Sequence, residues 1–124
     1  MERTNFEKLQ VYQLSEKIAD SVWNIVVTWN EFARDTVGKQ IVRSADSIGA
    51  NIAEGSGRGS LVDNRRFVRM ARGSLYETLH WLRRSYTRKL LSQSEVKSLR
   101  VLGQELSPKL NAFLRSVDER AKSR

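Results

Sequence analysis

The residues best suited to chemistry are arginines at helical spacing between positions 65 and 83. Arg65, Arg69, Arg72, Tyr76 and Arg83 fall near one line on a helix of about 3.6 residues per turn, and we call this line the arginine ridge. Guanidinium groups bind phosphates through paired hydrogen bonds, and an exposed tyrosine ring can stack on a base. The ridge, with Arg58 in the preceding turn, predicts contact with the phosphates of RNA or DNA.

An ordinary solvated helix face is the alternative interpretation of the ridge. Residues 55–90 carry nine Lys or Arg against Asp63 and Glu77, a net charge of +7 within a chain whose net charge is +8. Like charges four residues apart destabilise a helix, and surfaces that serve only solubility usually mix both signs. We therefore expect the ridge to face outward with almost no acidic partners and to meet an anionic ligand.

A second row of residues flanks the ridge and mixes charged with large apolar side chains. We call it the flanking row, and it contains Arg66, Met70, Glu77 and Trp81. These side chains could widen the core of a helical bundle. Alternatively they form an oligomer interface, because tryptophan, methionine and arginine are enriched at interfaces. We favour the interface.

The segment that precedes the ridge is predicted to form a structural turn. Gly55 and Gly57 lie in the sequence GSGRGS, and glycine accepts the left-handed conformation that ends helices. We expect Asn51 and Glu54 to hold this turn, through backbone amides and through an ion pair between Glu54 and Arg58. A ligand or catalytic role for that pair is the alternative, but no second acid, nucleophile or base accompanies it.

Other catalytic and metal-binding chemistry finds little support in the chain. The sequence has no cysteine and a single histidine, His80, and it lacks paired carboxylates at catalytic spacing. The glycine-rich turn follows a predicted helix and lacks the Gly-Lys-Ser/Thr ending of a phosphate-binding P-loop. We predict a protein that is not an enzyme and that uses no metal or cofactor.

Apolar periodicity supplies the elements that must position these residues. It predicts an all-α fold with helices over about 5–29, 35–55, 60–90 and 94–117, and a polar tail over 118–124. Short connections favour one domain, an antiparallel up-down-up-down four-helix bundle over residues 1–117. Asn5, Ser60 and Ser94 are the expected N-caps, and Pro108 is expected to kink or split the fourth helix.

The sequence also predicts a cytoplasmic location for the protein. Its N-terminus has no apolar run of the signal-peptide type, and no segment approaches the roughly 20 apolar residues of a membrane span. The absence of cysteine fits a reducing compartment. We expect no membrane association.

Several short motifs together resemble one protein family. They are Phe6-Glu-Lys-Leu9, Asn51-Ile-Ala-Glu-Gly55, Gly57-Arg58, Arg66-Phe67 and Gly73-Ser74. To about residue 114 the chain resembles the bacterial 23S rRNA-intervening sequence proteins. The resemblance implies an antiparallel four-helix bundle, commonly a homopentamer, with no catalytic residues to carry over.

A related branch of that family suggests a second possible role. It contains the accessory variability determinant of diversity-generating retroelements, a basic pentamer that binds nucleic acid and a reverse transcriptase. Our expectation is a basic oligomer that binds RNA or DNA with low sequence specificity. The alternatives are an adaptor that recruits a protein partner such as a reverse transcriptase, and a structural oligomer whose charge serves solubility.

Overall fold

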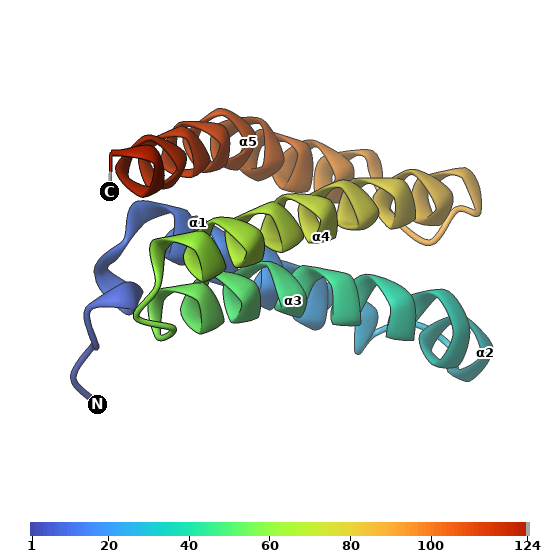
Figure 1. Cartoon of the computed structure of the whole chain (residues 1–124). Coiled ribbons are helices and arrows are strands. Elements are labelled where there is room, and N and C mark those ends of the chain that lie inside the picture. The colour runs from blue at the N-terminus through green and yellow to red at the C-terminus, as the bar shows by residue number, and fades with distance from the viewer. Residues whose placement is uncertain (124) are drawn as a thin grey trace.

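The regular structure of this protein is entirely helical in the computed structural model, which describes residues 1–123. Four long helices dominate: α1 (Gln10–Val26), α3 (Lys39–Ser56), α4 (Leu61–Thr87) and α5 (Gln93–Lys122). A short 3-10 helix, η1 (Phe6–Lys8), precedes α1, while α2 (Glu31–Ala33) and the π-helical η2 (Arg34–Gly38) lead into α3. The predicted all-α, single-domain, four-helix fold is therefore confirmed (Figure 1).

Contacts between successive helices show that neighbours run in opposite directions. Near the start of α4, Arg65 reaches Asp118 near the end of α5, and further along Arg72 reaches Asn111. Between α3 and α4, Ser44 lies 3.0 Å from Thr78, and Asn51 lies 3.5 Å from Ser74. Rising residue numbers on one helix thus meet falling numbers on the next. In Figure 1 the chain likewise reverses direction at each connection.

The core is formed by the apolar positions that recur every three or four residues on all four helices. Its most deeply buried members include Val22, Ile41, Ile48, Ile52, Val68, Leu75, Leu106, Leu110 and Val117. Four small polar residues are also buried, namely Ser15, Ser44, Thr78 and Ser85. Each hydroxyl donates to a carbonyl of the preceding helical turn, so no hydrogen-bonding capacity is lost by burial. No helix within residues 1–123 has the length and apolarity to cross a bilayer.

The first predicted helix is divided in the structure. Leu9 is extended, so η1 ends before α1 starts at Gln10, and Asn5 makes no capping bond from its side chain. After α1, the side chain of Asn30 caps α2 by accepting a 3.0 Å bond from the amide of Ala33. At the end of η2, a Cβ on Gly38 would lie 2.8 Å from Val26 Cγ1, which shows how closely the chain passes α1 there.

The connections around α4 depend on specific caps. The Ser60 hydroxyl accepts a bond from the amide of Asp63, as the sequence predicts. The cap of α5 is Ser92 rather than Ser94, because Ser92 and Glu95 form a reciprocal capping box. The end of α4 is set by Lys89, whose φ of 62° is left-handed.

The last helix differs from expectation in two ways: it is not split at Pro108, and it continues beyond residue 117. Pro108 lies inside α5 and does not split it, because the proline is exposed and removes one hydrogen bond from the solvent side. The polar segment from Asp118 continues the helix to Lys122 instead of forming a tail, since Asp118 is held by Arg65. Arg124, the last residue of the expected tail, lies outside the described residues.

Candidate nucleic-acid interface

Helix α4 presents the candidate site because it packs between α3 and α5 and leaves one long face to solvent. Its buried face consists of Phe67, Val68, Ala71, Leu75, Thr78, Leu82 and Ser85. Its six arginines all lie away from that face. The structure separates them into residues at the α5 margin, residues exposed to solvent and residues at the α3 margin.

Arg65 lies at the α5 margin and has an acidic partner. Its Nη1 is 2.8 Å from Asp118 Oδ1, and the two side chains are 25% and 27% exposed. The hydrogen bond from Arg65 lowers the pKa of the Asp118 carboxyl, and the positive charges of Lys122 and Arg69 lower it further. The expectation that the ridge lacks acidic partners is therefore wrong for Arg65, because the partner comes from a distant part of the chain.

Arg72 lies two turns further along the same margin. Its Nη1 is 3.4 Å from the side-chain oxygen of Asn111 on α5, and its side chain is half-buried. Arg65 and Arg72 thus connect α4 to α5. To bind an external anion, both arginines would have to give up these contacts with α5.

Arg69, Tyr76 and Arg83 form the part of the ridge that faces solvent. All three residues are exposed, Tyr76 to 53%. Within residues 1–123, neither Arg69 nor Arg83 forms an ion pair. At about 1.5 Å per residue, the two arginines are separated by about 21 Å along the helix axis.

Gly73 lies between Arg69 and Tyr76 on the exposed face of α4. A Cβ built on it would have no neighbour within 4 Å, so packing does not require glycine there. Glycine in a helix interior costs about 1 kcal/mol relative to alanine. Its position leaves the helix backbone accessible at the centre of the exposed face, where a ligand could approach closely.

The flanking row lies toward the α3 margin. Met70 is 48% exposed, whereas Trp81 is half-buried and packs against the core. The indole of Trp81 donates a 3.1 Å hydrogen bond to the carboxylate of Glu77, so that carboxylate has a partner on its own helix. Trp81 therefore does widen the core, while Met70 remains an exposed apolar side chain beside arginine.

The turn between α3 and α4 carries a compact cationic group. Arg58 forms the predicted ion pair with Glu54 at 2.8 Å. The Arg58 guanidinium lies 4.9 Å from the centre of the Phe67 ring, and that of Arg66 lies 5.0 Å from the same ring. Arg66 also approaches Asp63 at 3.8 Å. The guanidinium groups of Arg58 and Arg66 thus lie over the ring of Phe67, while both side chains remain largely exposed.

The roles of the turn residues differ from those predicted. The amide of Asn51 donates to the carbonyl of Ser47 and, at 3.5 Å, to the hydroxyl of Ser74, so it links α3 to α4 and does not bind the turn. Gly55 lies within α3, and Gly57 has an ordinary φ of −85°. The left-handed residue is Gly59, with a φ of 72°.

A groove between α4 and α5 is the main site feature that the sequence interpretation missed. It has a volume of about 790 Å³, and it is lined by Leu79, Leu82, Arg83, Tyr86, Gln93, Val96, Lys97, Arg100, Val101, Gly103, Gln104 and Ser107. Arg83 belongs both to this groove and to the exposed part of the ridge. The available signal was the series of small residues Val96, Gly103 and Ser107 on the α5 side.

The chemistry that this surface can support is anion binding. In the part of the chain that the structure describes, no three His, Asp or Glu side chains gather in a way that could hold a metal ion. Of the exposed arginines on this surface, Arg58 lies closest to a carboxylate, that of Glu54 one helical turn earlier in the chain. Exposed guanidinium groups and aromatic rings bind phosphates and bases without needing a catalytic pair.

Comparisons with known proteins place the chain in a family. Residues 7–112 match the family described as 23S rRNA-intervening sequence protein. A crystal structure from Bacteroides thetaiotaomicron, of a protein with unknown function from the S23 ribosomal protein family, is similar, with a TM-score of 0.74 and 25% identity over 84% of this chain and 97% of that one. No curated protein sequence matches. The chain thus belongs to the 23S rRNA-intervening sequence protein family.

Proposed function

We propose that this protein is a non-enzymatic, oligomeric nucleic-acid-binding bundle that contacts RNA or DNA mainly through the phosphate backbone. The observation that carries the proposal is the exposed face of α4, where Arg69 and Arg83 flank Tyr76 and form no ion pair among residues 1–123. The family description, which refers to 23S rRNA, supports a nucleic-acid context. A cytoplasmic location is part of the same proposal.

The spacing of the cations suits a nucleic-acid strand. About 21 Å between Arg69 and Arg83 corresponds to roughly six nucleotide steps of 3.4 Å. Gly73 leaves the helix surface open between them, so a phosphate chain can lie against α4. Phosphate contacts of this kind carry no base information, which is why we expect low sequence specificity.

Assembly into a homo-oligomer, a pentamer by the family resemblance, is the second part of the proposal. Met70, which is 48% exposed, offers an apolar contact that the single chain does not use, and the long side chain of Arg66 beside it can form hydrogen bonds with a second subunit. Glu77 and Trp81 continue the same row. Repetition of α4 around a ring would multiply the positive field that attracts a polyanion. Mass measurement in solution tests the stoichiometry.

Charge reversal on the exposed face of α4 tests the nucleic-acid proposal. The variant Arg69→Glu/Arg83→Glu should lose affinity for both RNA and DNA oligonucleotides in fluorescence anisotropy at low salt, since attraction becomes repulsion at two contacts. Lys39→Glu/Arg43→Glu is the charge-matched control, because Lys39 and Arg43 are exposed on the neighbouring helix α3. Unchanged affinity of the double variant, with a native circular dichroism spectrum, would overturn the proposal.

A protein-interaction adaptor, for example an accessory subunit of a reverse transcriptase, is the alternative that the exposed Met70 and Tyr76 favour. Apolar and aromatic side chains among arginines are typical of protein interfaces as well. In that case purified protein alone should bind neither RNA nor DNA at low salt, and the same oligonucleotides should be retained only when the protein partner is added.

A further inference from the structure

The groove between α4 and α5 is bordered by residues of both helices. Val96, Gly103 and Ser107 recur at helical spacing on α5 and line it together with Leu79 and Leu82 of α4. At Gly103 the two helices approach closely, since an added Cβ would lie 3.3 Å from a methyl group of Leu79. The volume of about 790 Å³ falls within the roughly 300–1,000 Å³ of small-ligand sites.

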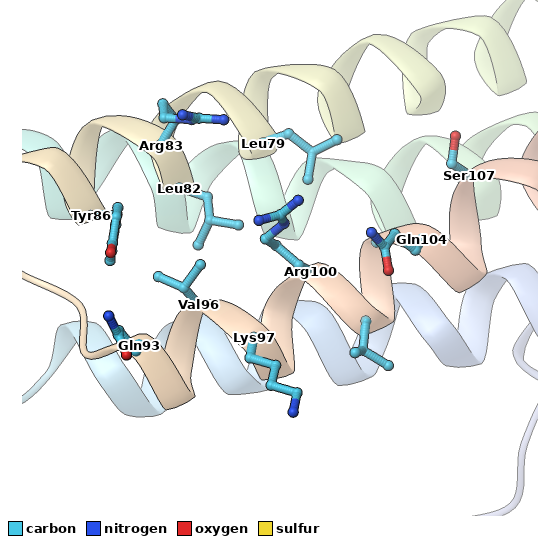
Figure 2. A pocket seen from close by; sticks show the side chains of 12 residues that line it. Leu79, Leu82, Arg83, Tyr86, Gln93, Val96, Lys97, Arg100, Gln104 and Ser107 are labelled. Atoms are coloured by element: carbon cyan, nitrogen blue, oxygen red, sulfur yellow. The ribbon is translucent and has the colours of Figure 1, made fainter.

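The lining combines an apolar floor with a cationic rim. Figure 2 shows Leu82 of α4 and Val96 of α5 pointing toward one another, with Leu79 further along the same wall. Arg100 extends from α5 toward α4 across the groove, and Lys97 projects away from it. The lining residues include Arg83, Lys97 and Arg100 but no Asp or Glu. A ligand that fits must therefore pair an apolar part with a negative charge.

Polar groups at the two ends of the groove narrow the ligand class further. The amides of Gln93 and Gln104 can each donate and accept hydrogen bonds, which matches the mixed edge of a nucleic-acid base. Tyr86, at the Gln93 end, is 42% exposed and offers an aromatic surface. An aromatic heterocycle joined to a phosphate satisfies the apolar floor, the amides and the cations together.

We propose that the α4–α5 groove binds one unstacked nucleotide of a single strand, with its base against Tyr86, Leu82 and Val96 and its phosphate near Arg83 and Arg100. The inference rests on the proposed function and deepens it. Because Arg83 borders both surfaces, a strand that follows the exposed face of α4 can pass directly into the groove. The site thereby favours single strands over duplexes, whose bases are paired and stacked.

A base-reporting oligonucleotide tests this inference. The probe is a 12-nucleotide single strand with one 2-aminopurine, compared with its duplex and with a strand that is abasic at the same position. The wild-type protein should bind the intact strand about tenfold more tightly than either comparison strand, within the range that stacking of one base produces. The fluorescence of 2-aminopurine should fall on binding, because the base stacks on an aromatic ring.

Two variants and a control assign the effect to the groove. Tyr86→Ala and Arg100→Gln should each remove most of the single-strand preference while leaving the affinity for duplex within about twofold. Arg120→Gln is the control, because Arg120 is exposed on α5 and does not line the groove. Tyr86 and Arg100 are both exposed, so neither substitution should prevent folding.

The possible results separate this inference from the proposed function. If single strand, abasic strand and duplex bind equally well, or if both variants keep the wild-type preference, the groove assignment is wrong while backbone binding stands. Loss of all binding in the wild-type protein would instead refute the proposed function. Displacement of the probe by free adenosine monophosphate at equal concentration would show a mononucleotide site and would contradict the strand assignment.

Discussion

The guanidinium of Arg65 lies 2.8 Å from the carboxylate of Asp118, and this ion pair joins the beginning of α4 to the end of α5. It removes one cation from the surface that could meet an external anion. Arg72 makes a weaker contact with Asn111 along the same margin. The proposed binding face is therefore centred on Arg69 and Arg83, and two of the five ridge residues serve the packing of the bundle.

Replacement of Asp118 by asparagine should destabilise the protein at neutral pH. The pKa of Asp118 is lowered by its hydrogen bond from Arg65 and by nearby positive charge, so its ionised form stabilises the folded state. That contribution is complete above the ordinary value of 3.8 and is lost as pH falls through the lowered pKa. The difference in Tm between wild type and Asp118→Asn should therefore be largest at neutral pH and should shrink below pH 3.8. A difference that does not change with pH would contradict the ion-pair account.

Alanine substitutions at Gly55 and Gly73 should have opposite effects on stability. A Cβ at Gly55 would lie 2.7 Å from the side-chain oxygen of Asn64 and 2.9 Å from Phe67 Cβ, so Gly55→Ala should cost about 1–3 kcal/mol. At Gly73 the Cβ meets nothing, and Gly73→Ala should gain about 1 kcal/mol through helix propensity. Urea denaturation measures both changes. Equal effects of the two substitutions would show that the close approach of α3 and α4 at Gly55 is absent in solution.

Replacement of Asp46 by asparagine should stabilise the protein at neutral pH. Asp46 is exposed at the surface, but partial desolvation raises the pKa of its carboxyl and the negative charge of Asp20 raises it further, so the ionised form destabilises the folded state. For a raised carboxyl pKa, stability falls as pH rises from the ordinary value of 3.8 through the folded value. The gain in Tm from Asp46→Asn should be present at pH 7 and absent below pH 3.8. A lower Tm for the variant at pH 7 would contradict this.

Replacement of Lys89 by glycine should stabilise the end of α4. Lys89 has a φ of 62°, and the amides of Lys89 and Leu90 bond back to the carbonyls of Tyr86 and Ser85, which is the Schellman pattern. The left-handed conformation costs a residue with a Cβ roughly 1–2 kcal/mol, so Lys89→Gly should gain about 0.5–1 kcal/mol after the entropy of the unfolded chain is included. Lys89→Ala is the control and should bring no gain. Similar stability of both variants would argue against strain at this position.

Local sequence pattern predicts those parts of the fold that depend on local spacing. The core positions Ile48 and Leu75 follow from apolar recurrence, and the capping of α4 by Ser60 follows from residue type. The partner of Arg65 could not be predicted in this way, because Asp118 is 53 residues away and its contact depends on how α5 is rotated against α4.

The groove shows a second limit of sequence reasoning. Its lining comes from two helices, and the register of α5 on α4 decides which side chains border the space between them. Val96, Gly103 and Ser107 are visible in the sequence, but that they border one groove together with Leu79 appears only in three dimensions. Similarly, Pro108 indicates a break by residue type, yet it is tolerated on the exposed side of α5.

The most direct test of the account is the salt dependence of affinity for a single-stranded oligonucleotide in wild type and in Arg69→Gln/Arg83→Gln. Each phosphate contact contributes a slope of about −0.7 to a plot of log affinity against log salt for single strands. Phosphate contacts at Arg69 and Arg83 predict a steep negative slope for the wild-type protein and a slope shallower by about 1.4 for the double variant, in which two contacts are lost. A wild-type affinity independent of salt, or an identical slope for both proteins, would show that these arginines do not bind the phosphate backbone.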